Sequence, residues 1–315
     1  MRVVFITHND LGLACLEELV DLGADVRSVF TRPQHEGVAD QTDLSTFTTR
    51  HDIPLHEVES VNQPAITDRI AECDPQLLFV IGWSRLVDQQ VLDLSSVASL
   101  GMHPAPLPRG RGRAPIAWNL IKGLERTQLS FFHLVEEADA GDLVGQEPIE
   151  IDLEDDAATL YAKVVDAGRE LIQTYYPRFE RGEVPRTPQS DERATWWPKR
   201  RPHHGLIEWT RPPMEVYNWI RGQSHPYPGA FSHLNDRRVT IWAAAPPTTE
   251  RAFTRPGEIQ YRDGDALGVG AWEGTIELTR VQVEGGDEQP AAALLERDDV
   301  TVGDRFENAR DRLLE

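Results

Sequence analysis

His103 and Asp139 are the residues of this sequence whose types and surroundings best suit proton chemistry. An imidazole near a carboxylate can accept and return a proton, and it can donate a hydrogen bond to a developing oxyanion. The loop after His103, residues 104–113, contains three prolines that fix its backbone, while Gly110 and Gly112 permit turns. A lone histidine beside a basic loop is usually structural, so the functional hypothesis depends on the distant aspartate.

The same loop carries Arg109, Arg111 and Arg113, three fixed cations close to His103 in the sequence. Guanidinium groups match the paired oxygens of carboxylates and phosphates. We therefore predict that Arg109 and Arg111 bind an anionic part of a substrate. The alternative is that these arginines cap helices or pair with nearby acidic residues.

The elements that must position these residues are typical of an α/β fold. Residues 2–7 and 77–81 are continuous apolar runs, as expected of buried parallel strands. Asn9 is expected to cap a helix that ends at Gly23. Ligands in open α/β sheets bind outside the carboxyl ends of the strands. We therefore expect His103, at the end of a strand, to face a pocket there.

Residues 98–146 resemble the signature of the folate-dependent formyltransferases, the family of methionyl-tRNA, glycinamide-ribonucleotide and amino-sugar formyltransferases. The family pattern is Asn-x-His, then Leu-Pro-x-x-Arg-Gly, then Asp-x-Gly. The corresponding residues here are Gly101-Met102-His103, Leu107-Pro108-Arg109-Gly110-Arg111-Gly112 and Asp139-Ala140-Gly141. The sequence departs from the pattern at the catalytic Asn position, which is Gly101, and at a frequent serine position, which is Ala105.

The resemblance implies that an amine attacks the formyl carbon of 10-formyltetrahydrofolate. His103 is then the general base or an oxyanion donor, and Asp139 orients it or relays protons through water. In the family, the Asn amide donates to the oxyanion, and losing one such donor typically costs about 2.7–4 kcal/mol. We expect a backbone N–H, a water or Asn119 to replace it. The alternatives are a slow enzyme, or a chain that has kept the fold and lost the chemistry.

The loop after the apolar strand 77–81 is assigned to the cofactor by the same resemblance. In the family, this loop helps to hold the pterin ring of the folate, largely through backbone groups. The implied cofactor-binding residues are Gly82, Trp83, Ser84 and Leu86, together with Asp139. For Trp83, simple packing is an equally good alternative.

The C-terminal part also resembles the amino-sugar enzymes, over residues 194–200, 207–209, 218–221 and 225–231. Arg221 and Tyr227 are thereby assigned to the acceptor site, with packing nearly as good an alternative for Tyr227. After residue 256 the pattern predicts short strands and glycine turns, and the resemblance implies that they form the small OB-like barrel of the family. We expect an α/β fold with a Rossmann-like formyltransferase domain (1–185, a parallel sheet with helices), a linker (186–205) and an OB-like, β-rich domain (206–315).

The chain is strongly acidic, with 52 Asp and Glu against 32 Lys and Arg and a formal net charge of −20. Such a surface suits high salt, where charge repulsion is screened, so we hypothesise a salt-adapted source; the alternative is an ordinary acidic cytosolic enzyme. Stability that stays flat or falls from low to molar KCl would contradict this.

The acidic surface also opposes binding to nucleic acid. Residues 32–46 lack the long basic insertion of tRNA formyltransferases, which argues against tRNA as the acceptor.

The remaining features define the setting of the protein. No run of about 18 apolar residues is present, so no membrane span is expected, and the N-terminus lacks a secretory signal. Cys15 and Cys73 have no metal-ligand spacing and indicate a reducing, cytoplasmic compartment without a metal site. The C-terminal domain suits a homodimer interface.

The predicted acceptor is a small amine, a nucleotide-linked amino sugar. The alternatives are methionyl-tRNA, or a folate-binding or 10-formyltetrahydrofolate-hydrolysing protein without transfer.

Overall fold

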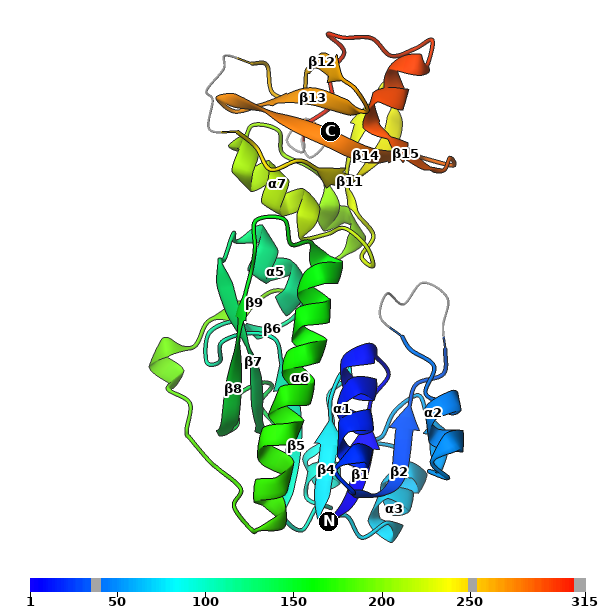
Figure 1. Ribbon diagram of the computed structural model, residues 1–315, viewed down its shortest axis with the longest axis vertical. Helices are drawn as coiled ribbons and strands as arrows, with labels where there is room; N and C mark the ends of the chain where they lie inside the picture. Colours follow the sequence, from blue (N-terminus) through cyan, green and yellow to red (C-terminus); the bar gives the residue numbers. More distant parts are fainter. Residues whose placement is uncertain (35–40, 249–253, 309–315) are drawn as a thin grey trace. The chain divides into compact units, whose positions relative to one another are not determined.

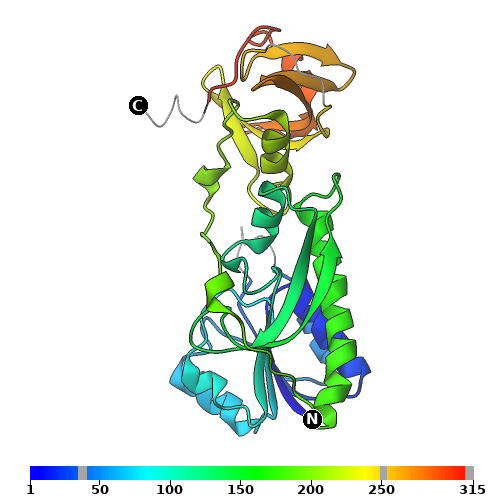
Figure 2. The same cartoon turned by 90° about the vertical axis from the view of Figure 1, so that its left-hand side faces the viewer.

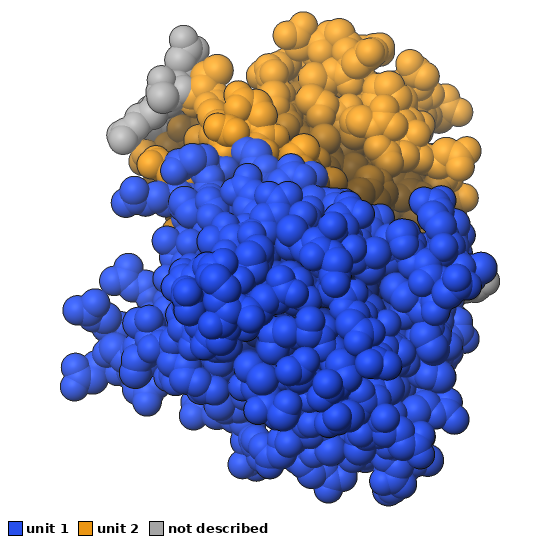
Figure 3. All heavy atoms as spheres, turned by 60° about the horizontal axis from the view of Figure 1, so that its bottom comes forward, with its two compact units in different colours: residues 1–115, 126–150, 161–198 blue, residues 116–125, 151–160, 199–315 orange. Residues whose placement is uncertain are grey.

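The computed structural model describes residues 1–34, 41–248 and 254–308, and the chain divides into two compact units (Figure 3). The units interleave along the sequence, whereas the predicted domains are continuous segments. Unit 1 consists of Met1–Pro115, Arg126–Glu150 and Tyr161–Pro198; unit 2 consists of Ile116–Glu125, Ile151–Leu160 and Lys199–Glu315. Each unit is described by itself below.

Unit 1 is built on a sheet with the strand order β3-β2-β1-β4-β5-β7-β8 (Figure 1). Its strands are β1 (Arg2–Ile6), β2 (Asp25–Thr31), β3 (Leu55–Glu57), β4 (Leu77–Val80), β5 (Ala98–His103), β7 (Arg126–His133) and β8 (Leu143–Glu150). The helices of this half of the chain are α1 (Asp10–Asp21), α2 (Ser45–Arg50), α3 (Pro64–Glu72), α4 (Gln89–Leu92), α5 (Pro115–Ile121) and α6 (Ala157–Glu180).

The direction of the strands differs between the two sides of this sheet. Strands β3, β2, β1, β4 and β5 run parallel, as predicted for the whole sheet. Strands β7 and β8 instead run antiparallel to their neighbours. A short connection joins β7 to β8, and residues of β8 alternate in part between buried and exposed, which is typical of an antiparallel edge.

Alternate residues of the central strands serve opposite faces of the sheet. On one face, Val4, Ile6, Leu78 and Val80 form a buried cluster with Ile70 of α3. On the other face, the rings of Phe5, Phe79 and Phe131 continue into Tyr175 and Phe179 of α6. Figures 1 and 2 show α1 and α6 on this second side and α3 on the first. The uninterrupted apolar runs in the sequence follow from burial on both faces.

The first helix begins and ends as the sequence predicts. The side chain of Asn9 accepts a hydrogen bond from the backbone N–H of Gly12, at 3.1 Å, and so caps α1. Gly23 takes a left-handed φ of 82° just after the helix, where a residue with a side chain would be strained. The predicted positions of the cap and the stop are confirmed.

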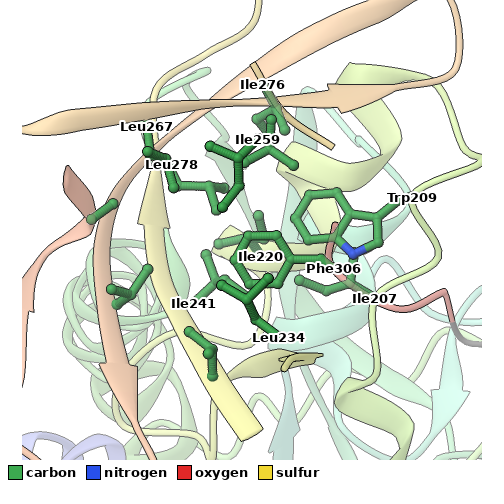
Figure 4. Packing of buried hydrophobic residues seen from close by; sticks show 14 of the residues in the cluster. Ile207, Trp209, Ile220, Leu234, Ile241, Ile259, Leu267, Ile276, Leu278 and Phe306 are labelled. Atoms are coloured by element: carbon green, nitrogen blue, oxygen red, sulfur yellow. The ribbon is translucent and has the colours of Figure 1, made fainter. Parts of the chain in front are cut away.

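Unit 2 contains an antiparallel sheet with the order β10-β11-β14-β13-β12, and β15 pairs with β14. Its elements are α7 (Pro213–Arg221), β10 (Ala230–Leu234), β11 (Arg237–Ala244), β12 (Ile259–Asp263), β13 (Ala266–Ala271), β14 (Gly274–Val283), β15 (Glu288–Pro290) and the 3-10 helices Pro202–Gly205 and Ala291–Glu296. Figure 4 shows Trp209, fully buried, among aliphatic residues from several strands. The predicted β-rich C-terminal domain is confirmed.

Two further observations complete the fold. Strands β6 (Arg111–Gly112) and β9 (Trp196–Trp197) form a small parallel pair, so the predicted linker over 186–205 contains regular structure, including the 3-10 helix Asp191–Arg193. Within the described ranges, no helix has both the length and the apolar composition needed to cross a membrane.

Candidate active site

A cavity of about 240 Å³ opens in unit 1 where β4 and β5 end. Most of its lining comes from the loop after β4, the end of β5, the loop that follows His103, and the loop between β7 and β8, with Val80 of β4, Leu92 of α4 and Phe132 of β7 completing it. His103 and Asp139 both contribute to its wall, although 35 residues separate them in the sequence. The carboxyl ends of the strands therefore hold the pocket, as expected of an open α/β sheet.

The imidazole of His103 is buried and has one defined hydrogen bond. Its Nε2 lies 2.8 Å from the carbonyl oxygen of Gly110. Because a carbonyl oxygen only accepts hydrogen bonds, Nε2 carries a proton in this arrangement. Nδ1 lies 3.7 Å from Oδ1 of Asp139, which allows an ion pair when the ring is protonated but exceeds a hydrogen-bond distance. Nδ1 is therefore the ring nitrogen available for proton transfer.

Asp139 is held by the same loop that holds His103. Its Oδ2 accepts a hydrogen bond from the backbone N–H of Gly112, at 2.8 Å, while Oδ1 faces the imidazole. Its backbone has a φ of 58°, a left-handed conformation that is uncommon for a residue other than glycine. The predicted pair of His103 and Asp139 thus meets at one wall of the cavity, joined through the backbone of residues 110–112.

The three arginines of the loop separate in the structure. The guanidinium of Arg111 is only 2% exposed and donates to Gln189 Oε1, at 3.2 and 3.0 Å, and to Asp191 Oδ1, at 3.1 Å. Arg109 is exposed and does not line the cavity. Arg113 does line it, and its Nη1 donates to the carbonyl oxygen of Ser84 at 3.3 Å. Arg111 is thus held by partners within the chain and Arg113 is the loop arginine at the cavity, while the substrate contacts of Arg109 and Arg111 stay predictions.

Gly101 forms part of the cavity wall, and the space beside it is occupied. A Cβ atom at this position would lie 2.7 Å from Cδ2 of Leu134 and 3.1 Å from the carbonyl oxygen of Val80. An asparagine could not enter unless Leu134 moved. The expected substitute donor, Asn119, is fully buried in α5, belongs to unit 2 and is not among the residues that line this cavity.

The residues assigned to the cofactor lie together in the loop after β4. Gly82, Trp83, Ser84 and Leu86 all line the cavity. The Trp83 ring packs edge-on against His8, with ring centroids 5.8 Å apart, so the packing and cavity-lining roles coexist. Its indole N–H is buried and has no hydrogen-bond partner within the described part of the chain. This donor is suited to a ligand acceptor.

Arg221 and Tyr227 lie in unit 2 and do not line this cavity. Arg221 is buried, and burial lowers the pKa of its guanidinium. Its Nη1 donates to the carbonyl oxygens of Asp152, Leu153 and Asp155, at 2.9, 3.1 and 2.9 Å. These contacts give Arg221 a stabilising role, and its predicted acceptor contact stays a prediction. Tyr227 is half-buried in the turn before β10.

Two loops contribute cavity residues that the sequence reasoning did not assign. Leu134, Val135 and Glu136 line the cavity from the loop that ends at Asp139, and Arg85 lines it from the loop after β4. Each of these residues is close in the sequence to a residue that was assigned to the site, and this was the signal that could have identified them. Across the described ranges, no group of three or more His, Cys, Asp or Glu side chains could hold a metal ion.

The sequence and the fold of this chain are similar to those of known proteins. Residues 1–175 match the model of the formyl transferase domain, and residues 199–298 match the formyl transferase C-terminal domain. HypX from Aquifex aeolicus, solved in complex with tetrahydrofolic acid, has a similar structure, with a TM-score of 0.67 at 22% identity over 94% of this chain and 47% of HypX. The chain thus spans about half the length of HypX.

Two shorter enzymes match along nearly their whole length. The N-formyltransferase from Helicobacter canadensis, in complex with folinic acid and dTDP-3-aminofucose, gives a TM-score of 0.66 at 16% identity, over 88% of this chain and 98% of the enzyme. Methionyl-tRNA formyltransferase from Clostridium thermocellum gives a TM-score of 0.57 at 15% identity, over 78% of this chain and 93% of the enzyme. At these identities the structures show a shared fold. Because the N-terminal family model alone covers more than half of the chain, the protein belongs to the formyl transferase family.

Proposed function

We propose that the protein transfers a formyl group from 10-formyltetrahydrofolate to the amino group of a nucleotide-linked amino sugar. The observation that carries this proposal is the meeting of His103 and Asp139 at one cavity, 3.7 Å apart, at the ends of the strands. The folate ligands of HypX and of the Helicobacter canadensis enzyme support the donor. The dTDP-3-aminofucose of the latter supports the acceptor class.

The cavity residues fit the ring system of a folate. Val80, Leu92 and Phe132 give the cavity apolar walls, and the indole N–H of Trp83 is a buried donor without a partner among the described residues. A flat heterocycle with polar edges would meet both requirements. We propose that Gly82, Trp83, Ser84 and Leu86 hold the ring and that Asp139 borders the reacting end.

The donor would supply an activated formyl carbon, and the side chains would manage protons and charge. As the neutral amine of the acceptor attacks the formyl carbon, His103 would accept its proton at Nδ1, because Nε2–H is committed to Gly110. Asp139 would stabilise the resulting imidazolium at 3.7 Å. The same imidazolium can then return the proton to the departing nitrogen of the donor, so both transfers use one histidine.

The oxyanion of this reaction needs a donor other than a side chain at position 101. Gly101 has none, and Leu134 occupies the adjacent space. Arg113 and Arg85 are the guanidinium groups that line the cavity, and Arg85 is paired with Glu59 at 3.2 Å. We therefore assign the stabilisation of negative charge to Arg113, which is exposed and donates one hydrogen bond to the Ser84 carbonyl oxygen, at 3.3 Å.

Several predictions about the setting of the enzyme stay proposals. Transfer to methionyl-tRNA is disfavoured by the net charge of −20. The missing basic insertion also disfavours it, although residues 35–40 of that segment lie outside the described residues. A cytoplasmic location, a homodimer and a salt-adapted source are predictions from the sequence.

A second candidate, hydrolysis of 10-formyltetrahydrofolate or folate binding without turnover, is favoured by the absence of a side-chain amide at Gly101. One experiment separates the candidates. The full-length protein is incubated with 10-formyltetrahydrofolate and, in turn, a panel of nucleotide amino sugars, methionyl-tRNA or no acceptor. Tetrahydrofolate released only with a sugar nucleotide supports the proposal. Release with tRNA alone, release without any acceptor, or binding without turnover would each overturn it in favour of the corresponding alternative.

A further inference from the structure

The segment between the two family matches contacts the catalytic loop directly. Residues 176–198 are covered by neither family model, and within them residues 187–197, here called the connecting segment, belong to unit 1. At its start, Thr187 exchanges two backbone hydrogen bonds with Leu143, at 2.8 and 2.9 Å. At its end, β9 pairs with β6. Both ends are therefore anchored to unit 1.

The side chain of Gln189, in the middle of the connecting segment, joins two walls of the site. Its Nε2 donates to the carbonyl oxygens of Asp139 and Gly141, at 2.8 and 2.7 Å. Its Oε1 accepts two hydrogen bonds from the buried guanidinium of Arg111, at 3.2 and 3.0 Å. One amide thus links the aspartate loop to the loop that follows His103.

The backbone around Arg111 is held by the connecting segment as well. Arg111 N–H donates to the carbonyl oxygen of Thr195 at 2.9 Å, and Gly110 N–H donates to the Thr195 hydroxyl at 2.9 Å. The adjacent groups of this backbone bind the reactive side chains: the Gly110 carbonyl accepts from His103, and the Gly112 N–H donates to Asp139. A displacement of this short strand would move both catalytic groups.

Two features make these contacts consequential for the site. Asp139 has a left-handed φ of 58°, a conformation that persists only when the surroundings enforce it. Arg111 carries a charge that is 98% removed from solvent, and such a charge must keep its partners. Gln189 serves both needs with one planar group, which donates on one side and accepts on the other.

We infer that Gln189 is a positioning residue for the formyl-transfer site, which fixes Asp139 opposite His103 by linking the Asp139 backbone to Arg111. This inference rests on the proposed function for its kinetic consequence. A glutamate at position 189 keeps the acceptor for Arg111 but loses both donations to the aspartate loop. An alanine loses all four hydrogen bonds.

The test compares full-length Gln189→Glu and Gln189→Ala with a matched control, Gln282→Ala, which removes a glutamine bonded to Trp242 and Gly286 in unit 2. For Gln189→Glu we expect kcat to fall by roughly 10- to 100-fold, the range for a small misplacement of a catalytic group. We expect the KM for the formyl donor to stay within about twofold, since the ring-binding loop is untouched. The pH–rate profile should change in Gln189→Glu and stay unchanged in the control.

Hydrogen exchange of the amides of residues 138–142 gives a second readout that needs no turnover. We expect faster exchange in both Gln189 variants and unchanged exchange in Gln282→Ala. If the wild type transfers no formyl group, the exchange result alone decides the inference, so the two failures are distinguishable. Wild-type kcat and exchange in Gln189→Glu would overturn it. The inference would also be overturned if Gln189→Glu lowered kcat, raised KM and lowered the melting temperature together. Such a result would indicate a general loss of structure and not a specific effect on Asp139.

Discussion

The site in unit 1 and the core of unit 2 are held together by different forces. Around His103 and Asp139, the contacts are directional hydrogen bonds between side chains and the backbone of residues 110–112, with left-handed conformations at Gly110 and Gly112. In unit 2, buried aliphatic and aromatic side chains surround Trp209 (Figure 4). Burial is non-directional and supplies stability, whereas hydrogen bonds define geometry. Substitutions in the two regions should therefore separate activity from stability.

The largest effect on turnover should come from His103. His103→Ala removes the proposed proton acceptor, and we expect kcat to fall by roughly 10²- to 10⁴-fold, the usual contribution of general acid–base catalysis. Melting temperature should fall less than in the Trp209→Ala variant below, because the variant loses a smaller buried ring, one hydrogen bond to Gly110 and the contact with Asp139. Single-turnover rates measure this, with the exposed His51→Ala as the control. Full turnover in His103→Ala would remove the site assignment.

The largest effect on stability should come from unit 2. Trp209 is fully buried, so Trp209→Ala should lower the free energy of unfolding by about 3–5 kcal/mol. The matched control is Trp272→Ala, since Trp272 is 54% exposed and its loss should matter little. Urea unfolding followed by circular dichroism measures both variants. The comparison fails if Trp209→Ala leaves stability intact, or if it abolishes turnover in molecules that are still folded.

Arg113 tests whether a cation replaces the missing amide. Arg113→Ala should lower kcat by roughly 10- to 100-fold, the equivalent of about 1.5–3 kcal/mol for a hydrogen bond to a charged group. Arg109→Ala is the control, because Arg109 is exposed and away from the cavity. Initial rates at saturating donor distinguish them. Equal rates in the two variants would contradict the assignment.

Gly101 tests the steric part of the site. Gly101→Asn should destabilise the protein by about 1–3 kcal/mol, the usual effect of overpacking, because its Cβ meets Leu134. The double variant Gly101→Asn, Leu134→Ala should recover much of that loss, and its amide should raise turnover above that of Leu134→Ala alone. Thermal melts and initial rates of the wild type, the two single variants and the double variant measure these effects. Additive effects of the two substitutions would show that the side chains do not compete for space.

The smallest effect should be a pH dependence at His133. Burial, the main cause, lowers the pKa of its imidazole below the ordinary value of about 6.5, while Nε2 lies 3.0 Å from the Pro185 carbonyl. The unfolded chain therefore binds the proton more readily, and the stability from neutral His133 is present above about pH 6.5 and declines as pH falls below it. His133→Gln should therefore make the free energy of unfolding depend less steeply on pH in this range, by an amount that corresponds to at most one bound proton per molecule. Urea unfolding from pH 5 to 8 measures it, and identical pH slopes would refute it.

Local patterns in the sequence predicted many of the elements well. Strands β1 (Arg2–Ile6) and β4 (Leu77–Val80) lie within the apolar runs 2–7 and 77–81 that were predicted to be strands. The cap at Asn9 and the stop at Gly23 were also correct. Burial on both faces produces uninterrupted apolar runs, and helix ends need specific residue types, so both leave a readable signal.

The candidate site was predictable only in part. Arg109, Arg111 and Arg113 are two residues apart, which would place them on one face of a regular strand. The left-handed Gly110 and Gly112 break that alternation, so the three side chains take different directions. A sequence pattern cannot show this divergence. The role of Arg221 likewise depends on carbonyl groups more than 60 residues away.

By itself, the sequence determined the family, the buried strands β1 and β4, the two ends of α1, and the two residues that meet at the cavity. These features depend on residue type and spacing, which are local or carried by a motif. Only the tertiary structure showed that Leu134 fills the space beside Gly101, that Arg113 lines the cavity while Arg111 is buried, and that Gln189 links the two loops. Such contacts join residues far apart in the chain, and their partners are chosen by packing that no local pattern records.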